Sequence, residues 1–336
     1  MSKGNVSRAA QNDIYSRLDA AIQSTVKLHA ERNDVEGRFP RENLQALAAG
    51  GWTGVLNEPR FGGLGLGHGD FAEAAYRIGQ HDASTGLVYV LHVGAAQTIN
   101  LFGNDDQKER WLKAKGSTPL GTYSTSERAS GGHWRYNFSE AARDGEDYVV
   151  NAEKSFTTSS GQADFYVVQT RSPGVKDQTD ISFFIVDGKA PGIKAGMWEA
   201  LGVRGNHSGP IRYNGVKVPS RDRLGGEGQG KEIKYDDVSP VYLISLGAVW
   251  EGVARGALNA AVAHTSSFVH KDKNKTCRTS GHPPGARGCK GACRDPTPVA
   301  QRTRRQAGCA VARRQAAERN SASSDGIQGS CCRSCQ

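Results

Sequence analysis

Residues 148–158 read YVVNAEKSFTT, a stretch that begins with strand-forming side chains and ends with hydroxyl side chains around one aromatic ring. β-branched and aromatic residues favour strands, whereas Gly, Asn, Asp and Pro separate one strand from the next. Further runs of the same kind occupy residues 165–168, 182–186 and 211–218. The sequence therefore predicts a central β domain, resembling a barrel or a sandwich, over residues 118–236.

In residues 1–117, apolar side chains recur with the spacing of a helix rather than with the alternation of a strand. The first predicted helix carries an apolar residue at every fourth position, namely Ile14, Leu18, Ile22 and Val26. Asn12 and Asp13 precede this stripe and are typical N-terminal caps. Further helices are expected over residues 40–50, 70–80, 84–102 and 104–116. Residues 84–102 are apolar on nearly every side, which is typical of a buried helix. We therefore predict a helical N-terminal domain and the α+β fold class.

Helical periodicity returns after the β domain. Ser239 and Pro240 suit a cap and a first helical turn, and apolar residues recur from there to about His270. We interpret residues 237–275 as the first helix of a C-terminal helical bundle. An amphipathic helix is stabilised chiefly by burial of its apolar face, so we expect that the rest of this bundle is missing and the domain is truncated.

The composition changes after Thr276. All seven cysteines follow this residue, and the segment contains no Leu, Met, Phe, Tyr or Trp. Such a segment cannot build a core, so we expect residues 276–336 to be an aberrant, disordered tail produced by a shifted reading frame. Four of its cysteines could supply thiolates to zinc, namely Cys289, Cys293, Cys332 and Cys335. Without an apolar scaffold around them, we expect no metal site.

The tail also carries most of the charge. Residues 277–336 hold eleven Lys and Arg against Asp295, Glu318 and Asp325, a surplus of eight in a formal net charge of +9. The remaining body is nearly neutral, so no nucleic-acid partner is expected. The body has no cysteine, the N-terminus has no apolar leader, and we see no stretch apolar enough for a membrane span. We therefore expect a cytoplasmic protein with no membrane partner.

The glycine-rich residues 62–67 (GGLGLG) do not form a dinucleotide-binding loop. The G-x-G-x-x-G spacing fails at His68, and no strand of adequate length precedes the segment. We interpret it as a connector between helices. The sequence also lacks a P-loop and the H-E-x-x-H zinc motif, so neither nucleotide triphosphate nor zinc hydrolysis is supported.

Two polar segments of the β domain are candidates for a binding site. They are residues 121–127 (GTYSTSE) and residues 154–160 (KSFTTSS), and each combines hydroxyls with an aromatic ring. A flat heteroaromatic cofactor binds on an apolar face with a few donors at its polar edge. The alternative is that both segments are solvated strand ends, because Thr and Ser occur commonly there.

Six motifs of the body resemble the acyl-CoA dehydrogenase family of flavoenzymes. In chain order they are residues 58–65 (EPRFGGLG), 102–108 (FGNDDQK), 123–127 (YSTSE), 148–158 (YVVNAEKSFTT), 201–206 (LGVRGN) and 252–258 (GVARGAL). Separately they are weak, but they follow the family order and spacing. The family has a helical domain, a β domain and a C-terminal four-helix domain. The resemblance therefore implies the same fold for this chain.

The resemblance further implies FAD as the cofactor. It places Ser126 near the N5 edge of the flavin, with Tyr123 and Thr125 on the same segment. Phe156 stands where the family often has Trp against the ring. Thr157 and Thr158 would contact the ring edge, and donors there would stabilise the negative charge that reduction puts on the ring. Electron-transfer flavoprotein or a flavin reductase as partner, a homotetramer and a role in fatty acid metabolism are implied in the same way.

The family reaction removes a proton from the carbon α to a thioester and transfers hydride from the β carbon to flavin N5. The base for this step is unknown here, because one family position lies beyond the break and the other aligns with Tyr242. Gly132 stands where the family commonly has a serine near the substrate. We expect Glu251 to face solvent. His92 is either a satisfied core residue or a proton carrier near the site.

Three hypotheses of function follow. The first is an FAD-dependent acyl-CoA dehydrogenase that desaturates an acyl thioester, with this chain impaired by its truncated helical domain. The second is a flavin-dependent monooxygenase of the same fold, acting on an aromatic or sulfur substrate. The third is a non-catalytic remnant that neither binds FAD tightly nor oligomerises.

Overall fold

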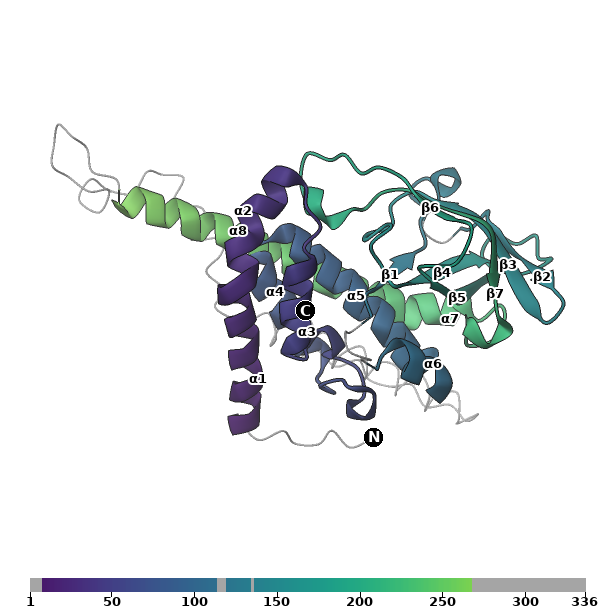
Figure 1. Cartoon of the computed structure of the whole chain (residues 1–336), viewed down its shortest axis with the longest axis horizontal. Coiled ribbons are helices and arrows are strands. Elements are labelled where there is room, and N and C mark those ends of the chain that lie inside the picture. The colour runs from purple at the N-terminus through teal and green to yellow at the C-terminus, as the bar shows by residue number, and fades with distance from the viewer. Residues whose placement is uncertain (1–7, 114–118, 134–135, 268–336) are drawn as a thin grey trace, which may run out of the picture.

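The computed structural model describes residues 8–113, 119–133 and 136–267 (Figure 1). Its first element is one long helix made of α1 (Arg8–Ala21), the π-helical turn η1 (Ile22–Val26) and α2 (Lys27–Glu36). Leu18, Ile22 and Val26 are buried, as their spacing predicts. Asn12 and Asp13 lie inside this helix and do not cap it, so that part of the prediction is wrong. Upstream residues continue the helix, and a cap residue has no role within a helix.

The other N-terminal helices are α3 (Arg41–Ala49), α4 (His68–Gly79), α5 (Ala83–Phe102) and α6 (Asp105–Trp111). Nearly all of α5 is buried, which confirms the central helix that its apolar composition predicts. The Asp82 side chain caps α5 by accepting a hydrogen bond from the Thr85 amide at 3.1 Å. Asn104 and Gln107 form the predicted capping box of α6. Short 3₁₀ turns, η2 (Trp52–Gly54) and η3 (Pro59–Phe61), precede the glycine-rich connector that leads into α4.

The β domain is an eight-stranded sheet with the order β6-β7-β3-β2-β4-β5-β8, and β1 pairs in parallel with β4. Its strands are β1 (Gly121–Ser124), β2 (Glu140–Asp144), β3 (Asp147–Lys154), β4 (Phe165–Arg171), β5 (Ile181–Asp187), β6 (Ile193–Ala195), β7 (Ile211–Val218) and β8 (Arg223–Leu224). The four predicted strands correspond to β3, β4, β5 and β7. The sequence did not predict β1, β2, β6 and β8.

The sheet folds back on itself. β2 pairs along its length with β3 but meets β4 only at Glu140 and Arg171, so the sheet bends there. Side chains of the two halves consequently share one apolar core that contains Tyr148, Tyr166 and Tyr213. The opposite face of β4 and β5 packs into the core of the helical domain. This sandwich-like arrangement confirms the α+β fold class.

A long C-terminal helix joins the two domains (Figure 1). It consists of α7 (Gly230–Ile233), the π-helical turn η7 (Lys234–Val238) and α8 (Ser239–Ser267). The predicted start at Ser239 is wrong, because the helix begins at Gly230. α8 packs closely on α4: a Cβ on Gly79 would meet the Val249 carbonyl oxygen at 2.6 Å. A Cβ on Gly252 would meet the Tyr76 carbonyl oxygen at 2.2 Å, so both positions require glycine.

Among the residues that the structure describes, the other face of α8 exposes apolar side chains. Leu243, Trp250 and Val262 are 65%, 43% and 37% exposed. Residues 230–266 form a helix that is long and apolar enough to cross a membrane by length and composition alone, with 28% of its most apolar window buried. By that measure, our expectation of no such stretch is wrong. The predicted tail, its cysteines and His270 lie outside the described residues.

Candidate functional site

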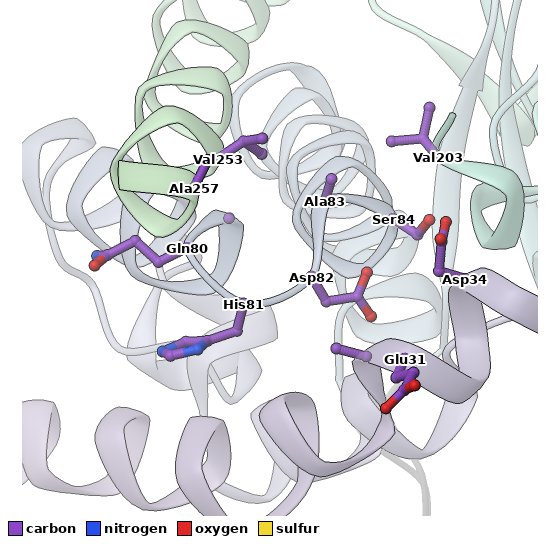
Figure 2. A pocket seen from close by; sticks show the side chains of 12 residues that line it. Glu31, Asp34, Gln80, His81, Asp82, Ala83, Ser84, Val203, Val253 and Ala257 are labelled. Atoms are coloured by element: carbon purple, nitrogen blue, oxygen red, sulfur yellow. The ribbon is translucent and has the colours of Figure 1, made fainter. Parts of the chain in front are cut away.

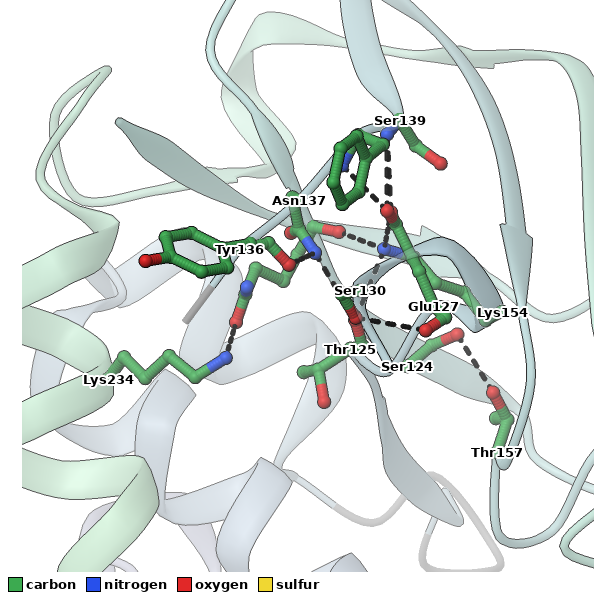
Figure 3. Close-up of polar contacts among 12 residues, drawn as sticks. Ser124, Thr125, Glu127, Ser130, Tyr136, Asn137, Ser139, Lys154, Thr157 and Lys234 are labelled. Atoms are coloured by element: carbon green, nitrogen blue, oxygen red, sulfur yellow. Dashed lines mark hydrogen bonds and ion pairs between the residues drawn. The ribbon is translucent and has the colours of Figure 1, made fainter. Parts of the chain in front are cut away.

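The two polar segments predicted from the sequence lie together. Residues 121–127 include β1 and the turn after it, whereas residues 154–160 follow β3, which is not a neighbour of β1 in the sheet. The Ser155 amide donates to the Ser126 carbonyl oxygen at 2.9 Å. The hydroxyls of Ser124 and Thr157 are 3.0 Å apart (Figure 3). These two contacts join the segments, which we call the paired strips.

The candidate cofactor residues of the paired strips point in different directions. Phe156 is 69% exposed, Ser126 is also exposed, and Thr125 is half-buried. Thr157 is buried against Ser124, and the Thr158 hydroxyl lies 2.8 Å from the Ser208 hydroxyl. These two threonines therefore hold the strips in place in this structure. Tyr123 is buried and points into the helical domain.

The exposed part of the paired strips fits a flat cofactor. The Phe156 side chain is 69% exposed, and its ring offers an apolar face to a planar ligand. The exposed Ser126 lies on the adjacent strip and supplies a hydroxyl and a backbone amide. An apolar face beside a few donors is the arrangement that a flavin ring requires. Phe156, Ser126 and Thr125 are therefore the residues that could hold it.

A buried ion pair between Glu127 and Lys154 also joins the two strips (Figure 3). Lys154 Nζ lies 2.7 Å from Glu127 Oε1, and the two side chains are 0% and 3% exposed. The Phe138 amide donates to Glu127 Oε2 at 2.7 Å. Burial alone would raise the pKa of Glu127, but the charge of Lys154 and these hydrogen bonds lower it below its usual range. The pair therefore fixes the turn after β1 to the end of β3.

A second buried lysine, Lys234 of η7, approaches the same region (Figure 3). Its Nζ donates to Gln169 Oε1, while the Gln169 carbonyl oxygen accepts from Lys154. Burial, together with the charge of Lys154, lowers the pKa of Lys234 to about 7. The ion pair of Lys154 is thus linked through Gln169 to the C-terminal helix.

A buried carboxyl lies on the same helical turn. Asp237 is 2% exposed, and its Oδ2 accepts a hydrogen bond from the Thr98 hydroxyl at 2.9 Å. The Thr98 hydroxyl also lies 2.7 Å from the Tyr123 hydroxyl. Burial raises the pKa of Asp237 to about 7, and the hydrogen bond from Thr98 opposes the shift. This polar chain connects α5, β1 and η7.

The sequence motifs did not identify Lys234, Asp237 and Thr98 as candidate site residues. A signal was present: helical spacing continues backward from Val241 through Val238 and Asp237 to Lys234 and Ile233, and all of these residues are buried. Two charged residues on a buried helical face indicate a functional or strained position. The predicted helix start at Ser239 concealed this pattern.

His92 has a structural contact that explains its burial. Its Nδ1 accepts a hydrogen bond from the Gly121 amide at 2.9 Å. Burial lowers the pKa of His92 to about 4, so the imidazole is neutral at physiological pH. The side chain thereby ties α5 to the start of β1, which favours the core role over proton transfer.

The remaining candidate residues do not meet the paired strips. Gly132 is exposed, with no atom within 4 Å of the position that a Cβ would take. Tyr242 lies half-buried on α8 and packs against the helical core. Glu251 is exposed on α8, as expected. None of these three residues gains a catalytic role from its position.

A cleft of about 390 Å³ opens elsewhere, between α2, the turn that joins α4 to α5, and α8 (Figure 2). Carboxylates and one imidazole line it together with apolar side chains of α8; they include Glu31, Asp34, His81, Asp82, Val253 and Ala257. The Asp82 carboxyl is already engaged in capping α5. No candidate cofactor residue lines this cleft.

Solved structures share this arrangement of domains. Butyryl-CoA dehydrogenase from Megasphaera elsdenii aligns with a TM-score of 0.72 and 24% identity, over 83% of this chain and 74% of that one. The helical domain, the folded sheet and the long helix between them therefore define a protein of the acyl-CoA dehydrogenase fold.

Sequence comparison places the chain within this class. The model of the acyl-CoA dehydrogenase N-terminal domain matches residues 8–117, and that of the middle domain matches residues 122–216. A probable acyl-CoA dehydrogenase of Bacillus subtilis is 30% identical over 241 residues, which are 70% of this chain and 63% of that protein. The short-chain-specific acyl-CoA dehydrogenase of Clostridium acetobutylicum is 29% identical over 246 residues, 72% of this chain and 64% of that protein. The chain belongs to the acyl-CoA dehydrogenase family, and it spans less than two thirds of the length of these relatives.

Proposed function

We propose that this chain carries the flavin-binding part of an FAD-dependent acyl-CoA dehydrogenase. The observation that carries the proposal is the exposed Phe156 ring beside the exposed Ser126, on two strips that hydrogen bonds hold together. Membership of the family supports the same function. The named relatives are acyl-CoA dehydrogenases, which supports desaturation of a thioester over oxygen chemistry.

The residues of the paired strips would have different roles in binding FAD. Phe156 provides the apolar face, while Ser126 and Thr125 provide donors and acceptors at the polar edge. The Ser124–Thr157 contact and the Glu127–Lys154 pair join the two strips, and the Thr158 hydroxyl is held by Ser208. A bound FAD would supply the acceptor for the hydride that leaves the β carbon of the thioester.

The substrate would lie against α8, on the face where Leu243, Trp250 and Val262 are exposed. Electron-transfer flavoprotein, a homotetrameric assembly and a cytoplasmic location belong to the same proposal.

Titration of the purified chain with FAD, followed by the quenching of flavin fluorescence, tests the proposal. Phe156→Ala should weaken binding about five- to tenfold, because an aromatic contact contributes about 1 kcal/mol. Leu28→Ala is the matched control, since Leu28 is also 69% exposed but lies on α2. Equal affinities for both variants would remove Phe156 from the site, and a chain that binds no FAD would overturn the proposal.

Addition of acyl-CoA to the FAD-loaded chain without oxygen tests the reaction. Bleaching of the flavin absorbance is expected, because a dehydrogenase takes its electrons from the thioester. A flavin that bleaches only with an external reductant would instead support the monooxygenase.

A further inference from the structure

The polar chain from Tyr123 through Thr98 to Asp237 crosses three elements that are distant in sequence. Tyr123 belongs to β1, Thr98 to α5 and Asp237 to η7. The hydroxyl oxygens of Tyr123 and Thr98 are 2.7 Å apart, and Thr98 Oγ1 lies 2.9 Å from Asp237 Oδ2. All three side chains are buried, with exposed fractions of 6%, 0% and 2%.

The Asp237 carboxyl has no counter-ion among the residues that the structure describes. Only the Thr98 hydroxyl opposes the effect of its burial. From β1, the Tyr123 hydroxyl faces it, while His92, the one imidazole of α5, is directed to Gly121. Lys234 on the same turn is directed to Gln169, and on α7 Lys231 and Glu232 are exposed. A buried carboxyl with such neighbours holds its proton up to neutral pH.

The hydroxyl and carboxyl hydrogens of Tyr123, Thr98 and Asp237 allow two hydrogen-bonding arrangements. When Asp237 is ionised, the Thr98 hydroxyl donates to it and can accept from the Tyr123 hydroxyl. When Asp237 is protonated, it donates to Thr98. The Thr98 hydrogen is then free to turn to the Gly94 carbonyl oxygen at 3.1 Å or to the Tyr123 oxygen. The ionised state therefore fixes Tyr123 as a donor to Thr98, whereas the protonated state also allows Tyr123 to accept from Thr98.

We propose that Asp237 is a positioning residue that sets, through Thr98, the hydrogen-bonding role of the Tyr123 hydroxyl at the base of the paired strips. Tyr123 immediately precedes Ser124, whose hydroxyl contacts Thr157 and so joins the two strips. A change in the role of Tyr123 reaches the candidate cofactor residues through this short connection. This consequence for FAD rests on the function proposed above, whereas the switch between the two arrangements does not.

Infrared difference spectroscopy of the flavin-free chain tests the switch directly. We expect a protonated-carboxyl band that persists to neutral pH and disappears with a midpoint near 7, together with a change in the tyrosine C–O band at the same pH. Asp237→Asn should remove both signals, and Asp236→Asn, on the exposed neighbour in the same turn, should keep them. A tyrosine band that does not change with pH in the unaltered chain would overturn the proposal.

Thr98→Val provides a second test that does not depend on the folding of the Asp237 variant. Loss of the hydrogen bond that lowers the pKa of Asp237 should move the carboxyl midpoint upward by about one pH unit. It should also uncouple the tyrosine band from the carboxyl. An unchanged midpoint, or a tyrosine band that still follows the carboxyl, would contradict the role of Thr98.

Flavin binding as a function of pH distinguishes a failure of this inference from a failure of the proposed function. FAD affinity that changes across neutral pH in the unaltered chain, but not in Asp237→Asn, supports the consequence for the paired strips. A chain that binds no FAD but shows both infrared signals overturns the proposed function and keeps the switch. A chain that binds FAD but lacks the tyrosine signal overturns the switch alone.

Discussion

Glu127 and Asp237 both have buried carboxyls, the first in the turn after β1 and the second on η7. Their surroundings shift the two pKa values in opposite directions. Glu127 has Lys154 at 2.7 Å and accepts hydrogen bonds from backbone amides, so its pKa is lowered. Asp237 has one neutral hydroxyl at 2.9 Å, and burial raises its pKa to about 7. The first carboxyl is charged at neutral pH, whereas the second changes its protonation state near neutral pH.

The difference shows which of the two carboxyls maintains the structure and which lowers its stability. A lowered pKa in the folded state stabilises the fold above the usual pKa of the group, and this contribution is lost as the pH falls through the lowered value. A raised pKa has the opposite sign, so Asp237 destabilises the fold increasingly as the pH rises toward 7. Destabilising ionisable groups concentrate at functional sites, and Asp237, unlike Glu127, is a group of this kind.

Removal of Lys154 should have the largest effect on the free energy of unfolding. Lys154→Met should lower the free energy of unfolding by about 3–5 kcal/mol, because it leaves the Glu127 charge buried without a partner. Urea unfolding at neutral pH measures the effect. Arg212→Met is the matched control, since the Arg212–Glu153 pair is 62% and 64% exposed and should contribute less than about 1 kcal/mol. Equal losses in both variants would show that Glu127 does not depend on Lys154.

Replacement of Asp237 should have the opposite effect on stability. Asp237→Asn cannot ionise, so its free energy of unfolding should exceed that of the unaltered chain at alkaline pH. The shift from 3.8 to about 7 sets an upper limit of about 4 kcal/mol for this gain. The gain should shrink as the pH falls below 7 and vanish in acid, in urea unfolding at several pH values. A difference that does not vary with pH, or one shared by Asp236→Asn, would mean that Asp237 is ionised at no cost.

The neutral hydroxyl pair of Ser124 and Thr157 lies between these extremes. Ser124→Ala should lower the free energy of unfolding by about 1–2 kcal/mol, because it leaves the buried Thr157 hydroxyl without its partner. The same denaturant experiment measures it. Ser24→Ala removes a hydroxyl from an exposed pair on η1 and should change stability by less than about 0.5 kcal/mol. A Ser124→Ala loss no larger than that of the control would show that the Ser124–Thr157 contact does not stabilise the strips.

Phe156 should have the smallest effect on stability. Phe156→Ala should change the free energy of unfolding by less than about 0.5 kcal/mol, because the ring is 69% exposed and buries little surface in the flavin-free chain. Unfolding with and without FAD measures this difference. A loss above about 1 kcal/mol without FAD would show that the ring packs in the fold and is not reserved for a ligand.

Long apolar runs allowed much of the fold to be predicted from the sequence. The buried helix α5 follows from its apolar composition, and the strands β3, β4, β5 and β7 follow from runs of β-branched and aromatic residues. β1 escaped because its residues are all buried yet include Thr122 and Ser124, so it has neither alternation nor hydrophobicity. β6 and β8 have three and two residues, too few for a period to appear. The start of the long helix was not predicted because charged residues occupy its buried face.

The sequence by itself determined the order of helical and strand segments and the family, because period and motif spacing are properties of the chain alone. It also singled out residues 121–127 and 154–160 as the strips that would lie at one site. Only the tertiary structure decided that Ser124 meets Thr157 and that Lys154 neutralises Glu127, while Asp237 has a threonine for its partner. Whether a carboxyl is charged or protonated depends on the groups that folding brings within hydrogen-bonding distance and on the water that folding excludes.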